Sequence, residues 1–349
     1  MTRSTLRPSL LALAASLGAL AMPAHALDIV FRDVTPGGMS SVQLAGFQAA
    51  GNYWESRLTD SVTVYVDISF ASLGSGVLGS ASTAFGNDSY SNVRTRMAGD
   101  AKSTLDGTAV SQLPTGSSLA FWISNGSAGG SFDNNTSDNN GKLTLSTANA
   151  KALGFTVDTT PDSPDGRIQF SSDFAFVYGR NDPAAASRFD FITVAEHEIG
   201  HLLGFVSSVD GVDRCLQFST CGTDPGAVEA NFYYTPLDLF RYSADGRDMR
   251  VGGSPYFSVD GGLSSIETFS TGEFRGDGNQ ASHFGGGSSN LMAPRIGVGQ
   301  AYDASTRDLA AFDAIGWDLA VTAVPEPRGA ALLLAGLALV GFTARRRRR

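Results

Sequence analysis

Cysteine and histidine are scarce in this chain, with two and four copies in 349 residues. Two cysteines cannot supply the cysteine-rich sets of four ligands that often hold structural zinc. Cys215 and Cys221 close a short segment, CLQFSTC, whose spacing does not suit a zinc knuckle. In an oxidising compartment such a pair predicts a disulfide that fixes a loop and takes no part in chemistry.

Long hydrophobic runs are missing except at the two ends of the chain. Residues 1–26 begin with two arginines, continue through an apolar stretch and finish with Ala24-His25-Ala26. This order predicts a secretory signal peptide that is cleaved after Ala26. A membrane anchor is the alternative, but the apolar stretch is short for a span.

The other end, residues 323–349, contains an apolar stretch from Gly329 to Ala344 and then five arginines. Alone, it predicts a marginal transmembrane helix with a cytoplasmic basic end; nucleic-acid binding by the arginines is the alternative. Pro325-Glu326-Pro327 precedes it, and the three parts together resemble the PEP-CTERM sorting signal. The resemblance implies export across the inner membrane of a Gram-negative bacterium, handling by an exosortase-type enzyme, and a location in the cell envelope or outside the cell.

Basic residues are few between these two ends. The terminal segments hold eight of the 25 basic residues and one of the 34 acidic residues. The 17 basic and 33 acidic residues that remain give the body a net charge of −16. A body of this charge is not suited to DNA or anionic lipid, so we expect no nucleic-acid partner.

Glycine, serine, asparagine and aspartate are frequent in the body, which predicts long loops and few helices. Amphipathic or capped patterns predict helices over 41–58, 146–154 and 305–317. Strands are expected over 62–70, 117–124 and 167–179. No internal repeat or long linker divides the chain, so we expect residues 27–322 to form one α+β domain with a loop-rich C-terminal part.

The stretch HEIGHLLGF, residues 197–205, has the composition of a metal site. Positions four apart lie one above the other on a helix, so His197 and His201 can direct their rings at one ion. Glu198 lies about 100° round the helix, where it can take a proton from water at the metal. Two helix histidines satisfied by ordinary hydrogen bonds are the alternative.

A catalytic zinc ion (Zn²⁺) usually has three protein ligands and one open position. His25 leaves with the signal peptide, so His283 is the only other histidine in the mature body. Asp210 is the alternative third ligand, or it orients a ligand histidine without touching the metal.

Gly204 follows the helix, and Met292-Ala293-Pro294 follows His283. With the two motif histidines, these residues resemble the leishmanolysin-like branch of the metzincin zinc proteases. The resemblance implies that His197, His201 and His283 bind zinc and that Glu198 is the general base. It also implies that Gly204 makes the turn that ends the helix and that Met292 forms a floor beneath the metal. It covers only about 190–206 and 281–294. Ser207 stands where shorter metzincin motifs have their third histidine, and no tyrosine follows Met292 by two residues, although Tyr302 can approach.

These observations predict an exported zinc endopeptidase that acts on protein or peptide substrates, with a metzincin-like catalytic domain of α+β class. No cysteine-switch segment precedes residue 41, so we do not expect latency by that route. Two alternatives remain open. One is an envelope or matrix binding protein with a structural metal, and the other is a zinc hydrolase of a non-peptide bond.

Two further segments have two interpretations each. FDNNTSDNNGK, residues 132–142, offers Asp133, Asn135 and Asp138 as oxygen ligands for calcium (Ca²⁺), but it lacks the spacing of an EF-hand and can equally be a solvated turn. ANFYYTPLDLFRYS, residues 230–243, is dense in aromatic residues. It forms either the wall of an apolar substrate pocket or local core.

Overall fold

The computed structural model describes residues 27–124, 129–220, 227–285, 287 and 289–320. The expected signal peptide (1–26), the expected sorting segment (323–349) and Cys221 lie outside the described residues. Within the described part, no helix has both the length and the apolar character needed to cross a membrane.

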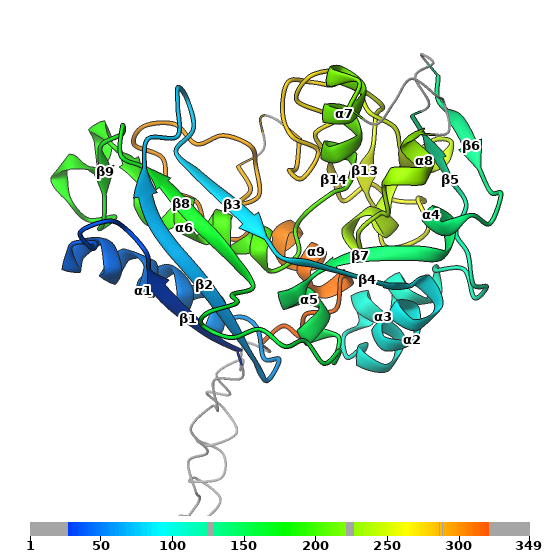
Figure 1. The fold of residues 1–349 in the computed structure, drawn as a ribbon, viewed down its shortest axis with the longest axis horizontal. Helices are drawn as coiled ribbons and strands as arrows, with labels where there is room; N and C mark the ends of the chain where they lie inside the picture. Colours follow the sequence, from blue (N-terminus) through cyan, green and yellow to red (C-terminus); the bar gives the residue numbers. More distant parts are fainter. Residues whose placement is uncertain (1–26, 125–128, 221–226, 286, 288, 321–349) are drawn as a thin grey trace, which may run out of the picture.

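A four-stranded sheet in the order β1-β2-β8-β3 forms one half of the molecule, on the left of Figure 1. Strands β1 (Leu27–Asp33), β2 (Val62–Ala71) and β8 (Gly166–Ser171) run parallel. Strand β3 (Gly79–Thr83) is antiparallel to β8 and forms the edge. The strand expected over 62–70 is therefore present, and Val64, Val66 and Ile68 bury it in the core.

Helices α1 (Ser41–Glu55) and α6 (Phe191–Leu202) pack against each other beside this sheet. Ser40 and Gln43 form a capping box that starts α1, because each side chain accepts a hydrogen bond from the other's backbone N–H. The buried Trp54 donates its indole N–H to Glu196 O of α6 at 2.9 Å. This bond fixes α6 relative to α1 and hence to the sheet.

The other half contains shorter strands and most of the remaining helices (Figure 1). Strand β4 (Phe85–Ser89) pairs with β7 (Lys142–Ser146), and a six-stranded sheet has the order β14-β13-β11-β12-β5-β6. The strands of that sheet are β5 (Phe121–Ile123), β6 (Ser131–Asp133), β11 (Arg241–Ser243), β12 (Gly246–Met249), β13 (Tyr256–Phe257) and β14 (Glu267–Thr268).

Helix α9 (Thr306–Ala314) lies between the two halves in Figure 1 and is buried through Ala311, Phe312 and Ala314. A capping box of Ser305 and Asp308 starts it. The other α-helices are α2 (Tyr90–Asp100), α3 (Thr104–Ser111), α4 (Asp138–Gly141), α5 (Thr147–Ala152), α7 (Val209–Phe218) and α8 (Ala227–Asn231). Two short 3-10 helices are η1 (Pro183–Ser187) and η2 (Leu237–Phe240). Strands β9 (Phe176–Val177) and β10 (Phe189–Asp190) form a separate two-stranded pair.

The mixed α+β class is confirmed, but the expectation of few helices is wrong. Helices α2 and α3 lack a strong apolar period, and Ser89 and Ser103 cap them by accepting a backbone N–H. Helix α7 has an apolar face, formed by the buried Val209, Val212 and Cys215, in a stretch where the sequence predicts loops. The strand expected over 167–179 is split into β8 and β9, and the one over 117–124 shortens to β5.

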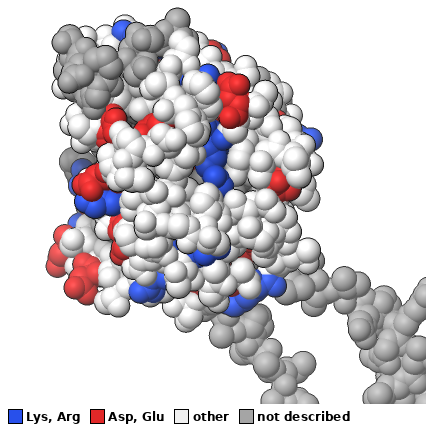
Figure 2. Space-filling model, turned by 90° about the vertical axis from the view of Figure 1, so that its right-hand side faces the viewer, with Lys and Arg blue, Asp and Glu red and all other residues white. Residues whose placement is uncertain are grey.

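Charged side chains are scattered over the described surface that Figure 2 shows, the right-hand side of Figure 1. Blue and red atoms form small separate groups among white ones, and no continuous basic stripe crosses the described part of this face.

Candidate metal centre

Helix α6 carries three of the candidate residues, and its two ends are well defined. Asp190 caps the start by accepting the backbone N–H of Thr193 at 2.7 Å. After the helix ends, Gly204 turns the chain at a φ of +115°, and a Cβ there would lie 2.9 Å from the Cβ of Asn149. Glycine is therefore required at this turn for its backbone conformation and for space.

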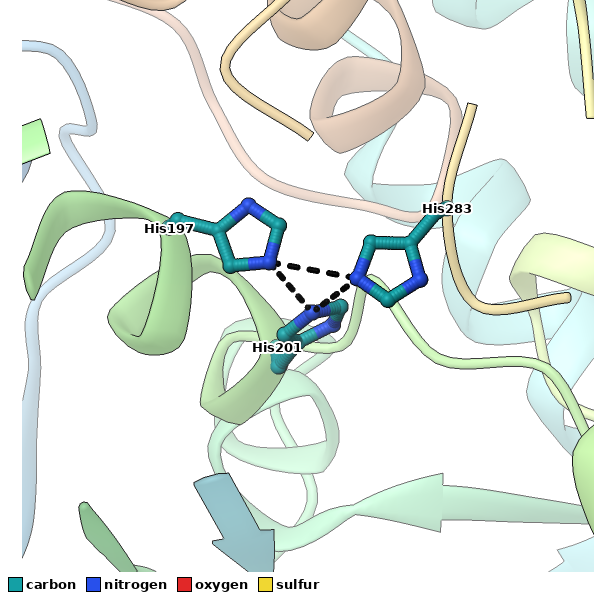
Figure 3. A group of neighbouring side chains, drawn as sticks. All are labelled: His197, His201 and His283. Atoms are coloured by element: carbon teal, nitrogen blue, oxygen red, sulfur yellow. Dashed lines mark hydrogen bonds between the residues drawn. The ribbon is translucent and has the colours of Figure 1, made fainter. Parts of the chain in front are cut away.

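The structure brings His283 to the two helix histidines, although it lies 82 residues after His201. Figure 3 shows the three rings pointing toward one another, two from α6 and one from the loop that follows β14. The Nε2 atoms form a triangle: 3.0 Å between His197 and His201, and 3.2 Å from each of them to His283.

Each Nδ1 atom has a backbone carbonyl as its partner. The Nδ1 of His197 lies 2.8 Å from Leu291 O, that of His201 2.7 Å from Phe205 O, and that of His283 3.1 Å from Gln280 O. A carbonyl oxygen only accepts, so each ring carries its proton on Nδ1 and directs the lone pair of Nε2 into the triangle.

Burial keeps all three rings neutral. Desolvation lowers the pKa of His197, lowers that of His201 well below its ordinary value, and lowers that of His283 to about 3. Three unprotonated nitrogens then face one point, an arrangement that is unfavourable without a cation. Tetrahedral zinc with bonds of about 2.0–2.1 Å separates its nitrogen ligands by roughly 3.3 Å, so the triangle fits zinc.

Glu198 lies beside this triangle and is 6 % exposed. Burial raises the pKa of its carboxyl to about 8, while the backbone N–H of Ala81 in β3 donates to it and acts in the opposite direction. A Cβ on Gly79 would lie 2.9 Å from Glu198 Oε1. The edge strand therefore lies directly against the carboxylate, and a glycine makes this approach possible.

Met292 lies under α6 and is fully buried. A Cβ on Gly200 would lie 2.6 Å from its Sδ, so the thioether occupies the space that this helix glycine leaves open. The same turn supplies Leu291 O, the partner of His197.

Asp210 is not part of the histidine triangle. Its carboxylate accepts the backbone N–H groups of Ala281 and Ser282 and the hydroxyl of Ser282. Burial raises the pKa of this carboxyl to about 6, against the lowering effect of those bonds. This position favours a role for Asp210 in orienting a ligand histidine without touching the metal. It does not favour the alternative role of third ligand.

In the segment 132–142, the side chains expected as calcium ligands bond to other groups of the chain. Asp133 Oδ2 accepts from Asn139 Nδ2 at 2.8 Å, whereas Asp138 pairs with Lys142 at 2.7 Å and is 70 % exposed. Cys215 is disulfide-bonded, but the partner that we expect, Cys221, lies outside the described residues. In the segment 230–243 four apolar side chains lie in the core and not along the cleft: Tyr234, Leu237, Leu239 and Phe240.

A cleft of about 1190 Å³ leads to the histidines, and β3 forms one wall. Leu78 O accepts from Ser171 N, and Ala84 N donates to Asp165 O, so the even-numbered residues of this strand bond to β8. Gly79, Ala81 and Thr83 therefore direct their backbone N–H and C=O groups away from β8, toward the free edge. Tyr302 also lines the cleft.

Sequence reasoning missed three residues of this site. Gly200 was visible as a glycine inside a helix, which usually has a packing reason. Asp308 caps α9, and it also binds the turn of Met292, which no local pattern indicates. Nothing in the sequence pointed to Gly79.

No family model, curated protein or solved structure matches this chain.

Proposed function

We propose that this chain is a zinc-dependent endopeptidase and that His197, His201 and His283 hold the metal. The observation that carries the proposal is the triangle of Nε2 atoms, because every Nδ1 is bonded to a carbonyl and the three lone pairs have no proton to share. The metzincin-like motif in the sequence supports the same reading.

Held by these three histidines, zinc would supply Lewis-acid chemistry and would lower the pKa of water in the site to about 7. Glu198 accepts the proton of the attacking water on its carboxylate and then donates it to the amine that leaves. The N–H of Ala81 holds this carboxylate in place during both transfers. The three histidines stay neutral throughout, and each Nδ1–H keeps donating to its backbone carbonyl.

A peptide substrate is favoured over other bonds by the free edge of β3. An extended chain can bind antiparallel or parallel to such an edge through main-chain hydrogen bonds. Gly79 and Thr83 offer the groups that would bond it, on either side of the position where Ala81 holds Glu198. The cleft, with a volume of about 1190 Å³, offers room for side chains of a bound peptide.

The test measures zinc content and casein digestion for the wild type, Glu198→Gln and His283→Ala. We expect one zinc per wild-type chain and digestion that a chelator abolishes. Glu198→Gln should keep the zinc and lose activity about 10²- to 10⁴-fold, whereas His283→Ala should lose activity and bind zinc measurably but much more weakly than the wild type. A structural metal in a binding protein predicts that Glu198→Gln changes no function. Zinc with hydrolysis of esters or amides but not of casein would favour the non-peptide alternative.

We also propose that the protein is exported and sorted by its two terminal segments, which lie outside the described residues. Mass spectrometry of the mature protein from the bacterium that produces it should show Leu27 as the first residue and loss of the arginine tail. An intact N-terminus would rule out cleavage by a signal peptidase.

A further inference from the structure

His283 is connected to Asp210 through a single peptide group. Gln280 O accepts the Nδ1 proton of His283, and the N–H of the same peptide group, that of Ala281, donates to Asp210 Oδ1. The neighbouring N–H of Ser282 donates to Asp210 Oδ2 at 3.0 Å. The partly buried carboxylate of Asp210 thus binds the two residues that precede the histidine.

His197 has the same connection to a different carboxylate. Leu291 O accepts the Nδ1 proton of His197, and the N–H of that peptide group, Met292 N, lies 3.0 Å from Asp308 Oδ1. Leu291 N also donates to Asp308 Oδ2 at 3.0 Å. Asp308 is fully buried at the start of α9, so the turn of Met292 is fixed from this helix.

We propose that Asp210 and Asp308 are positioning residues of the metal site, each acting on one ligand histidine through one peptide group. The inference rests on the proposed role of the histidines as zinc ligands. In a planar trans peptide the N–H and C=O point in opposite directions, so a carboxylate on the N–H polarises the carbonyl. The polarised oxygen is a better acceptor for the Nδ1 proton, and the imidazole becomes a stronger ligand.

A carboxylate bonded directly to a ligand histidine is a known way to orient it and raise its basicity. Here one peptide group stands between the carboxylate and the histidine.

The third histidine, His201, provides an internal comparison. His201 bonds Phe205 O, and the N–H of that peptide group, Val206 N, donates to Gly204 O at 2.8 Å rather than to a carboxylate.

The experiment measures zinc affinity by competition with a chromophoric chelator for Asp210→Asn, alone and combined with His283→Ala. Asparagine keeps the shape of the side chain but removes the charge, and its Nδ2 cannot accept from Ser282. We expect affinity to fall about 10- to 100-fold in the wild-type background. In the His283→Ala background it should change less than about two-fold, because the histidine through which Asp210 acts is absent.

Asp213→Asn is the matched control. Asp213 lies one turn further along α7, is more deeply buried than Asp210, and likewise accepts two backbone N–H groups, those of Phe274 (2.8 Å) and Arg275 (3.0 Å). Its segment does not adjoin a ligand. This substitution should lower the melting temperature as Asp210→Asn does and leave zinc affinity unchanged. Asp308→Asn, paired with His197→Ala, repeats the cycle for the second carboxylate.

The inference is overturned if Asp210→Asn keeps wild-type affinity, or if it weakens zinc binding equally with and without His283. Equal loss in the Asp213→Asn control would also overturn it, since the effect would then be general destabilisation. Failure of the proposed function looks different: the wild type would bind no stoichiometric zinc, or His283→Ala would bind it as tightly as the wild type.

Discussion

Gly200 stands in the interior of α6, where glycine costs about 1 kcal/mol relative to alanine. The cost has a local reason, since Met292 fills the space beside its Cα. Gly79 has a comparable reason, because the carboxylate of Glu198 lies against it. At both positions the absence of a side chain determines where a neighbouring group of the site can lie.

Gly200→Ala should destabilise the fold although alanine is the better helix former. The new methyl group would overlap Met292 Sδ, and such overpacking costs about 1–3 kcal/mol. Chemical denaturation measures the change in the free energy of unfolding. In a Met292→Ala background the same substitution should cost much less, and an equal cost in both backgrounds would contradict the contact.

Gly79→Ala should reduce proteolysis and leave zinc content unchanged. The methyl group would lie 2.9 Å from Glu198 Oε1 and displace the carboxylate. Misplacement of a catalytic group by about 1 Å can cost about 10²-fold in rate. Gly86→Ala in β4 is the control, because a Cβ there meets nothing within 4 Å. Equal kinetics for Gly79→Ala and Gly86→Ala would refute this role of the edge strand.

At the scale of elements, α6 depends on its first turn. Asp190 accepts both the N–H and the hydroxyl of Thr193 at 2.7 Å, and Arg180 Nε lies 3.6 Å from its Oδ1. Arg180 also reaches Asp303 at 2.7 Å and Tyr302 O at 3.0 Å. The start of the helix is thereby linked to the segment that lines the cleft.

Asp190→Ala should lower the free energy of unfolding by about 0.5–2 kcal/mol through loss of the cap. Asp190→Ser restores a capping oxygen without the charge and should recover most of that loss. Urea titration of the two variants measures both effects. If serine recovers nothing, the ion pair with Arg180 rather than the cap accounts for the contribution of Asp190.

The elements near the motif were predictable from the sequence, and several others were not. The pattern of α1, the alternation of β2 and the capping box of α9 are local signals, and each one gave the right element. Helix α7 was not predicted, although Val209, Val212 and Cys215 at spacings of three give it an apolar face and are buried. The pairs Asp210–Ser282 and Asp308–Met292 join distant segments, so no local pattern reports them.

At the scale of the whole molecule, the end of the described chain lies against the segment that precedes β2. Asp318 N donates to Asp60 Oδ2 at 2.9 Å, and one oxygen each of Asp60, Asp100 and Asp318 lie within 4.8 Å of one another. Lys102 bonds Asp318. Burial raises the pKa of Asp60 to about 7, of Asp100 to about 6 and of Asp106 to about 7.

The pKa of Asp60 is 3.8 in the unfolded chain and about 7 in the folded protein. Between these two pH values the folded protein therefore binds more protons than the unfolded chain. The stability that Asp60 contributes is therefore complete below pH 3.8 and is lost as the pH rises to about 7. Asp60→Asn should match the wild type near pH 4 and be more stable at pH 8, because it buries no charge. Urea unfolding at both pH values measures the difference, and a difference independent of pH would contradict the prediction.

The long interval between His201 and His283 has a consequence for biosynthesis. A nascent chain that has emerged only as far as α6 possesses two of the three imidazoles, and Asp308 is still to be translated. If the triangle is the hydrolytic centre, this capacity arises only after nearly the entire polypeptide has been made. The order of the ligands along the chain then postpones any hydrolysis by this centre until synthesis is almost complete.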